Sequence, residues 1–307
     1  MLWLLQTRVP DDRHQMVTPK EHVLCKQPQR SCEAALSGAA ELGLTGEDWV
    51  DYVERNGHVP WLIWYLEAGR GYGKTRVGAE DMAQYARTHP GARLALVGAK
   101  FADVRDTMVE GESGLLSVLD PTELKGGSVE AGWNRSMGEL VLANGARLKA
   151  FSAEKPDALR GPQHHRAWLD EIAAWKYVQE TWDQVMFGLR LGMCPQVIVT
   201  STPRPKALLR DIRSRPTTVV VKGTTFENRA NLSPTAMAEL RKRYEGTRLG
   251  RQELYGEFLE DVPGALWKRS QLDADRIVPG SMPLNLTRIV VALDPSVTSN
   301  EESDARP

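Results

Sequence analysis

The stretch "WLIWYLEAGRGYGKTRVGAE", residues 61–80, decides the fold. Residues 61–66 are large and mostly apolar, which is typical of a buried strand. From Thr75 onward, apolar residues recur at helical spacing until the sequence His89-Pro90-Gly91. Between the predicted strand and helix lies "AGRGYGKT", residues 68–75, with three glycines and a lysine. A strand, a glycine-rich turn and a helix in this order form a common phosphate-binding arrangement.

The glycine-rich turn is close to the nucleotide-binding pattern of Gly, four residues, Gly-Lys and Ser or Thr, although Ala68 stands in its first position. Its glycines allow a tight turn whose N–H groups point at an anion, and the helix N-terminus adds positive charge. We expect Lys74 to reach the β- and γ-phosphates of ATP, Thr75 to bind Mg²⁺ and Arg70 to contact a phosphate oxygen. The residues expected to surround the nucleotide are Gly69, Arg70, Gly71, Tyr72, Gly73, Lys74 and Thr75. The alternative is a turn that caps the helix and binds nothing.

A pair of acidic residues follows a second predicted strand in "HHRAWLDEIAAW", residues 164–175. Residues 167–169 predict a short buried strand, with Asp170 and Glu171 at its carboxyl end. Ligands of an open α/β sheet gather at this edge. We expect Asp170 to hold Mg²⁺ through water and Glu171 to polarise the attacking water. The alternative is an exposed acidic pair that caps the next helix.

A third segment, "PQVIVTSTPRP" at residues 195–205, places small hydroxyl side chains after a strand predicted over 197–199. Ser201 and Thr202 can hydrogen-bond a γ-phosphate and release it after hydrolysis. Taken by itself, the segment also fits a Ser/Thr turn without a ligand.

The remaining segments predict an α/β fold. Further strands are expected over 92–99, over 217–223, and over 138–151 as a hairpin turned at Asn144-Gly145. Helices are expected over 102–109, 178–191 and 206–213. Strands separated by helices favour a mostly parallel sheet with helices on both faces, built around the phosphate loop.

Composition limits the classes of protein to which the chain can belong. It has 307 residues and a formal net charge of −1, so its overall charge does not indicate nucleic acid. No apolar run is long enough to span a bilayer, and the first residues lack a signal-peptide core, so we expect no membrane partner. Cys25, Cys32 and Cys194 lack metal-binding spacing and fit a reducing, cytoplasmic setting.

Five stretches together resemble the large terminase subunit of tailed phages and prophages. They are "AGRGYGKTRVGAE", "DVRDTMVEGESGLL", "KPDALRGPQHHRAWLDEIAAW", "TSTPRP" and "GTTFENRANLSP…RYEGTRLGRQELYGEFLED". The resemblance covers about residues 45–300 and implies a RecA-like (ASCE) motor in the host cytoplasm. Such a motor hydrolyses ATP to drive double-stranded DNA into a procapsid. It implies as partners the portal protein, the small terminase subunit and further copies of the chain, typically in a pentameric ring.

The resemblance also implies roles for single residues. Lys74 and Thr75 become the phosphate and Mg²⁺ residues, and Asp170 and Glu171 the metal-binding and catalytic acids. Ser201 and Thr202 belong to the motif that couples hydrolysis to movement. Arg70 matches an arginine often found within the family's phosphate loop.

Arg105, in "DVRD", is the candidate for an arginine inserted into the neighbouring subunit's site. Such an arginine supplies positive charge where the transition state gains negative charge. The alternative is a surface arginine paired with Asp103 or Asp106 along a helix. Arg160 is a weaker candidate for the same role.

We expect three parts in the chain, the first inferred from a polar composition without helical period and the last implied by the resemblance. We expect a disordered arm over 1–35, a motor domain with a C-terminal helical linker over 36–260, and a linker with the first strand of a ribonuclease-H-like nuclease over 261–307. A helix is expected over 33–56. The nuclease strand would be "RIVVALDPS", residues 288–296, with Asp294 as its first metal-binding acid. Since the chain ends soon after it, we expect no nuclease activity from this chain.

Two basic segments are candidates for contact with the DNA backbone. The first holds six basic residues against the single acid Asp211: Arg204, Lys206, Arg210, Arg213, Arg215 and Lys222. The second is "ELRKRYEGTRLGR", residues 239–251. A solvated helix face is the alternative for either.

Two other functions stay open for the whole chain. One is a helicase-like DNA-dependent ATPase, and the other is a prophage remnant that binds partners without hydrolysing ATP.

Overall fold

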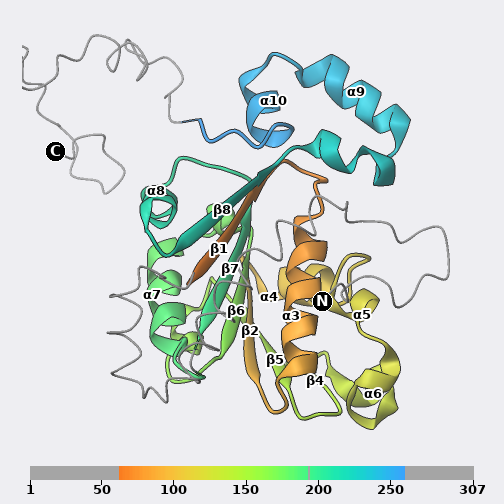
Figure 1. Ribbon diagram of the computed structural model, residues 1–307, viewed down its shortest axis with the longest axis vertical. Coiled ribbons are helices and arrows are strands. Elements are labelled where there is room, and N and C mark those ends of the chain that lie inside the picture. The colour runs from red at the N-terminus through yellow and green to blue at the C-terminus, as the bar shows by residue number, and fades with distance from the viewer. Residues whose placement is uncertain (1–61, 193, 260–307) are drawn as a thin grey trace, which may run out of the picture. The chain divides into compact units, whose positions relative to one another are not determined.

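The computed structural model describes residues 62–192 and 194–259 (Figure 1). Contacts divide the chain into two units, Met1–Leu259 and Glu260–Pro307, and every described residue belongs to the first. The expected arm over 1–35, the helix over 33–56 and the nuclease strand with Asp294 therefore lie outside the described residues.

The fold is built on one sheet of eight strands in the order β3-β4-β5-β2-β6-β7-β1-β8. The strands from β5 to β8 in this order are parallel to one another, and β3 and β4 are antiparallel additions at one end. The mostly parallel sheet expected from the sequence is thus confirmed. Its strands are β1 (Ile63–Ala68), β2 (Arg93–Gly98), β3 (Trp133–Asn134), β4 (Glu139–Val141), β5 (Arg147–Ser152), β6 (Arg166–Asp170), β7 (Gln196–Ser201) and β8 (Thr218–Gly223).

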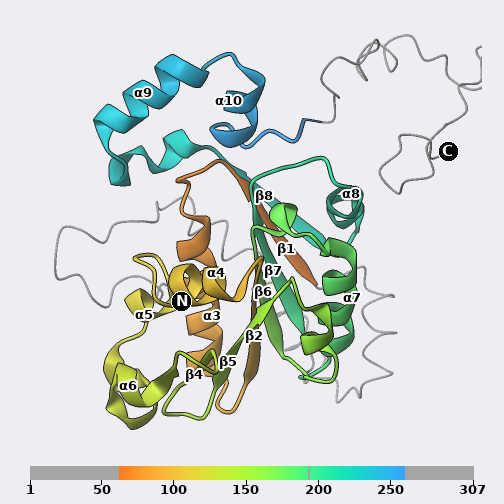
Figure 2. The same ribbon diagram turned by 180° about the vertical axis from the view of Figure 1, so that it is seen from behind.

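Helices cover both faces of the sheet (Figures 1 and 2). On one face lie α3 (Lys74–Thr88), α4 (Phe101–Asp103), α5 (Leu115–Val118) and α6 (Val129–Gly132), and on the other α7 (Val178–Gly188) and α8 (Ala207–Ser214). Alternate residues of β1 enter the two cores, with Trp64 and Leu66 on the α3 side and Ile63 and Tyr65 on the α7 side. Burial on both faces explains why β1 is a continuous apolar run.

The local predictions hold with small shifts. The hairpin formed by β4 and β5 turns at Asn144-Gly145, as expected. Gly145 adopts a φ of 86°, and Asn144 Oδ1 accepts a hydrogen bond of 3.0 Å from the N–H of Ala146, which stabilises the turn. The helix expected over 102–109 is α4 followed by a π-helix, Val104–Val109. The buried residues of the π-helix are Val104, Met108 and Val109. Because a π-helical turn contains more residues than an α-helical turn, these three side chains lie on one face.

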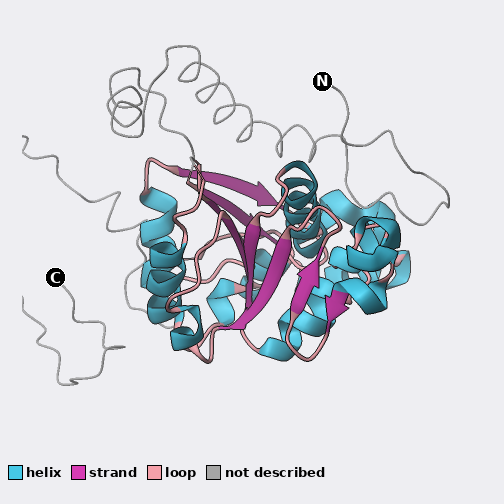
Figure 3. Cartoon of the chain, turned by 90° about the horizontal axis from the view of Figure 1, so that it is seen from below, coloured by secondary structure: helices cyan, strands magenta, loops and turns pink. Residues whose placement is uncertain are grey.

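After β8 the chain forms a small helical segment (Figure 1), in addition to the helices on the two sides of the sheet, which Figure 3 shows from below. It consists of the 3₁₀ stretch Thr225–Asn231, α9 (Pro234–Tyr244) and α10 (Arg248–Glu253). Helix α9 has no buried residue. Among the helices of the described ranges, none is both long and apolar enough to cross a membrane.

Candidate nucleotide-binding site

The glycine-rich turn joins β1 to α3 and is closed around the amino group of Lys74. Gly71 and Gly73 have φ values of 74° and 107°, in the left-handed region that favours glycine. Lys74 begins α3, and its Nζ donates to the carbonyl oxygens of Ala68 at 3.0 Å and Gly69 at 3.2 Å. Its side chain is only 7% exposed. The lysine charge is thus buried inside the turn.

Residues far along the chain hold the turn in place. Tyr72 packs so closely on Gly223 that a Cβ there would lie 2.1 Å from the Tyr72 ring. Thr225 Oγ1 donates to the carbonyl of Arg70 at 2.6 Å, and Asn228 Nδ2 donates to that of Gly71 at 2.7 Å. Sequence reasoning missed Thr225 and Asn228, although both lie in the "GTTFEN" stretch that carries part of the family resemblance.

Arg70 points from the turn toward α10. Its guanidinium Nε donates to Glu253 Oε2 at 2.7 Å, and its backbone N–H donates to the Glu253 carbonyl at 2.7 Å. The Arg70 side chain is 74% exposed. In this structure Arg70 therefore ties the turn to α10.

Asp170 ends β6, and the neighbouring strand holds its carboxylate. Thr200 of β7 lies opposite Asp170 in the sheet and donates from Oγ1 to Asp170 Oδ1 at 2.6 Å. Trp168 Nε1 donates to the Thr200 hydroxyl at 2.8 Å. The Thr200 oxygen is thus the acceptor for Trp168, and the Thr200 hydroxyl proton points at the Asp170 carboxylate. Burial raises the pKa of Asp170 to about 6, with the Thr200 bond opposing the shift. Sequence reasoning did not assign Thr200 this role.

Glu171 follows in a strained backbone conformation. Its φ of 48° makes it the one non-glycine residue with positive φ among the described residues. Its N–H donates to the Thr200 carbonyl at 2.7 Å. Its Oε2 accepts from the N–H of Thr202 at 3.2 Å, and its Oε1 lies 3.4 Å from Lys74 Nζ. Strain of this kind is found at functional sites more often than elsewhere.

Strand order explains why these residues meet. β7 lies between β1 and β6, so Thr202, directly after β7, stands between the turn and the acids. Thr202 Oγ1 accepts from Lys74 Nζ at 3.2 Å and donates to Glu171 Oε1 at 3.3 Å. Ser201 is fully buried and bonds backbone groups, accepting from the Ala173 N–H at 3.2 Å. The structure thus brings Lys74, Glu171 and Thr202 together, with Asp170 beside Glu171.

The candidate arginines differ in their partners. Arg105 Nε and Nη2 donate to the two carboxylate oxygens of Asp106 at 2.6 and 2.8 Å, which is the local pair expected as the alternative. Arg160 is exposed after the 3₁₀ turn Pro156–Leu159. In the first basic segment, Arg213 Nη2 lies 3.6 Å from the buried Glu67 carboxylate, and its guanidinium stacks on Phe258.

The fold and the glycine-rich turn before α3 are those of the P-loop class of α/β proteins. The family model described as "Terminase large subunit, T4likevirus-type, N-terminal" matches residues 65–274, and the chain belongs to this family.

Solved structures of phage large terminases are similar to this chain at low sequence identity, and the first two described here share its fold. The large terminase of a thermophilic bacteriophage matches at a TM-score of 0.52 and 13% identity, over 64% of this chain and 48% of that one. The same thermophilic-phage terminase in complex with ADP matches at a TM-score of 0.51 and 14% identity, over the same shares. The ATPase domain of the Thermus phage P74-26 large terminase is 18% identical over 68% of this chain and 97% of that one, at a TM-score of 0.45. This chain spans about half the length of the thermophilic-phage terminase.

Proposed function

We propose that this chain contains the ATP-hydrolysing motor of a phage DNA-packaging terminase. The observation that carries the proposal is the meeting of Lys74, Glu171 and Thr202 at the carboxyl edge of the sheet, with Lys74 Nζ 3.4 Å from Glu171 Oε1. A phosphate-binding cation and a general base are the two parts that ATP hydrolysis requires at one place. Membership of the terminase family supports the assignment.

ATP would bind with its phosphates in the turn of residues 69–75. Lys74 now donates to neutral carbonyl oxygens, and a phosphate oxygen is a stronger, charged acceptor. The thermophilic-phage terminase, which has this fold, was solved with ADP. Arg70 could reach a phosphate only after leaving Glu253, so we propose that it exchanges partners when ATP binds.

The residues proposed for Mg²⁺ fit that ion. Asp170 offers a carboxylate and Thr75 a hydroxyl on the first turn of α3, and oxygen atoms are the ligands that Mg²⁺ prefers. Burial raises the pKa of Asp170, and a nearby cation is what would keep this carboxylate ionised. When bound, the ion would neutralise charge on the phosphate oxygens.

Glu171 would act as the general base. Its side chain is 42% exposed, so water can reach it, and the Thr202 N–H fixes one of its oxygens. Ser201 and Thr202 follow one another at the end of β7 and would respond to the γ-phosphate through Thr202. Arg105 remains our candidate for a charge supplied to a neighbouring subunit, for which it would have to leave Asp106.

The proposed partners are double-stranded DNA, the portal protein, the small terminase subunit and further copies of the chain in a pentameric ring in the host cytoplasm. Within the first basic segment, Arg210 is exposed on α8, whereas Arg213 sits against the buried Glu67. Arg210 is therefore the better residue with which to test contact with DNA. Arg210→Glu should lower DNA-stimulated hydrolysis and spare basal turnover.

ATP hydrolysis by the wild type, Lys74→Ala and a control, Lys125→Ala, tests the proposal. Lys125 is exposed and lies outside the site. Loss of hydrolysis in Lys74→Ala alone supports the ATPase. Equal, near-zero rates in all three proteins would instead indicate a remnant without hydrolysis, and strand displacement on a forked duplex would favour a helicase.

A further inference from the structure

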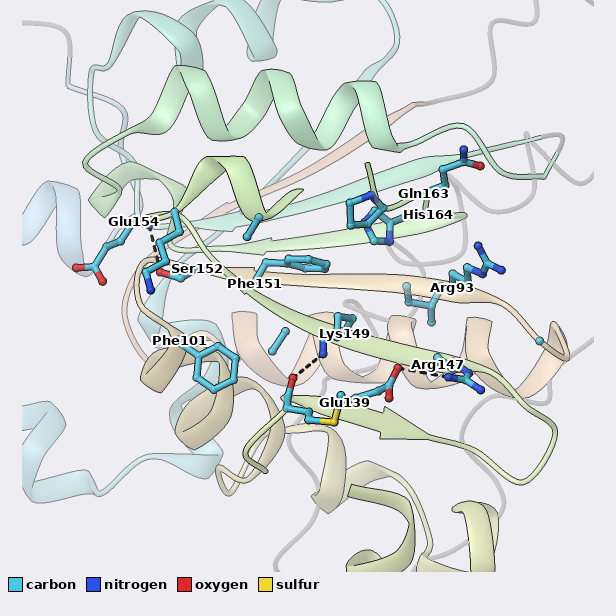
Figure 4. A pocket seen from close by; sticks show the side chains of 17 residues that line it. Arg93, Phe101, Glu139, Arg147, Lys149, Phe151, Ser152, Glu154, Gln163 and His164 are labelled. Atoms are coloured by element: carbon cyan, nitrogen blue, oxygen red, sulfur yellow. Dashed lines mark hydrogen bonds and ion pairs between the residues drawn. The ribbon is translucent and has the colours of Figure 1, made fainter. Parts of the chain in front are cut away.

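A cavity lies along β5, mainly on the α7 face of the sheet (Figure 4). Its volume is about 1050 Å³, and no residue of the candidate nucleotide site lines it. We propose that this groove binds a short segment of single-stranded nucleic acid. The proposal does not depend on the ATPase activity proposed above.

The groove exists because the helices of this face cover only part of the sheet. The α7 side of β6, β7 and β1 packs against α7 and α8 in one core. Toward β5 and β4 that face carries charged side chains instead, since Arg147, Lys149 and Phe151 alternate on β5 while Leu148 enters the opposite core. Arg147 and Lys149 are two residues apart, about 7 Å along the strand.

Apart from Arg147, the cations of the groove lack the acidic partners that most arginines of the described chain have. Arg93 on β2 lies directly beside Arg147 on β5 in the parallel register, and like charges at such positions repel. Arg147 has Glu139 at 3.6 Å. Arg93, Lys149 and Lys155 have no carboxylate partner among the described residues, and Lys149 Nζ donates to the Met137 carbonyl at 2.6 Å. An anionic ligand would relieve this repulsion.

His164 supplies a second, independent indication of a ligand. It lines the groove, is 3% exposed, and has no hydrogen-bond partner for either ring nitrogen in the described structure. Its ring meets Phe151 edge-on at 5.5 Å between centroids. Burial lowers the pKa of His164 to about 4, so the neutral ring offers one donor and one acceptor. Unpaired buried polar groups are costly, and the edge of a nucleobase could pair with them.

The combination favours a single strand over other anions. Single-stranded nucleic acid is held by cations that follow its backbone and by aromatic side chains that contact its bases. The groove has such cations, and Phe151 and Phe101 also line it, as Figure 4 shows. Phe151 is 6% exposed within the core of the α7 face, and Phe101 packs against the core of the α3 face, so a base would meet their edges. Arg93 and Arg147 lie toward one end of the groove and Lys149 lies near its middle, whereas Ser152 and Glu154 lie toward the other end (Figure 4). The labelled cations therefore line one end and the middle of the groove. An unpaired base can also reach His164, whereas a base within a duplex is stacked and paired.

Fluorescence anisotropy with a labelled twelve-residue oligothymidylate and the full chain tests the proposal. The groove variant is Arg93→Ala/Lys149→Ala, and the control is Lys125→Ala/Arg190→Ala, which removes the same charge from exposed positions off the groove. We expect about tenfold weaker binding in the groove variant and less than about twofold change in the control. The slope of log Kd against log salt should fall by about 1.4 in the groove variant, since two phosphate contacts are lost.

Other outcomes would overturn the proposal. Equal affinity of the groove variant and the wild type would remove the groove as a nucleic-acid site. A duplex that binds as tightly as the single strand, and loses as much in the variant, would assign the groove to duplex DNA. Displacement of the oligonucleotide by millimolar AMP with the same sensitivity to the variant would assign it to free nucleotides.

Discussion

Asp81 of α3 and Arg166 of β6 form a fully buried ion pair, with both side chains 4% exposed. Arg166 Nε and Nη2 each lie 2.8 Å from an Asp81 oxygen, and Arg166 Nη1 donates to Gln196 Oε1 at 2.6 Å. The pair joins the helix that begins with Lys74 to the strand that ends with Asp170. It thereby fixes the distance between the two halves of the candidate site.

Removing one partner of this pair should cost the protein much of its stability. Asp81→Ala leaves a buried guanidinium without its carboxylate, and we expect a loss of about 3–5 kcal/mol in the free energy of unfolding. Urea denaturation measures the loss. The control is Glu257→Ala, which removes an exposed partner of Arg251 and should change stability by less than about 1 kcal/mol. Equal effects of the two changes would contradict the structural role of the buried pair.

Gly78 lets α3 approach β6 closely. A Cβ at this position would lie 2.2 Å from the indole of Trp168. Gly78→Ala should therefore push α3 from the sheet and destabilise the protein by about 2 kcal/mol, although alanine favours helices. The loss of stability is measured by thermal unfolding monitored with circular dichroism. Gln84→Ala, on the same helix, is the control. A higher melting temperature for Gly78→Ala would show that the helix and Trp168 are not in this contact.

His164 should make stability depend on pH. Burial lowers its pKa in the folded state to about 4, whereas the unfolded chain takes up a proton near the ordinary value of about 6.5. The unfolded state therefore binds the proton first, and stability falls as the pH drops from about 6.5 toward 4. Between pH 7.5 and pH 5 the wild type should lose about 2 kcal/mol more than His164→Gln. Parallel pH profiles of the two proteins would show that His164 is not buried in its neutral form.

Arg105 should affect turnover rather than nucleotide binding. If Arg105 acts on a neighbouring subunit, turnover per chain should rise with protein concentration. Arg105→Ala should then lower turnover by about 10³-fold and leave the affinity for ATP unchanged. Arg135→Ala, which also removes a cation beside Asp106, is the matched control. Wild-type turnover in Arg105→Ala would leave Arg105 as the surface partner of Asp106.

Local patterns predicted the strands and the main site residues because the signals are local. The apolar run of β1, the glycines after it and the acids at the end of β6 each lie within a few neighbouring residues. What holds these parts together is distant in sequence. Thr225 and Arg70, for example, are joined by a hydrogen bond across a separation of 155 residues, and no local pattern announces it.

Strand order was also beyond local reasoning. Because β7 lies between β1 and β6, the end of β7 stands between Lys74 and Glu171, where Thr202 bonds both. The pairing of Arg213 with Glu67 depends in the same way on α8 packing beside β1. Counting charges along the sequence placed Arg213 in one cluster with the exposed cations, because the sequence does not show that the buried Glu67 carboxylate of β1 lies beside Arg213.

A comparison of the wild type with Glu171→Gln tests the central claim most directly, by measuring ATP binding and single-turnover hydrolysis separately. It should be done with Mg²⁺ and duplex DNA at high protein concentration. The carboxamide keeps the shape of Glu171 but cannot accept a proton, so we expect ATP affinity within about threefold of the wild type and hydrolysis slower by at least about 10²-fold. Hydrolysis at the wild-type rate in Glu171→Gln would contradict the assignment of the site.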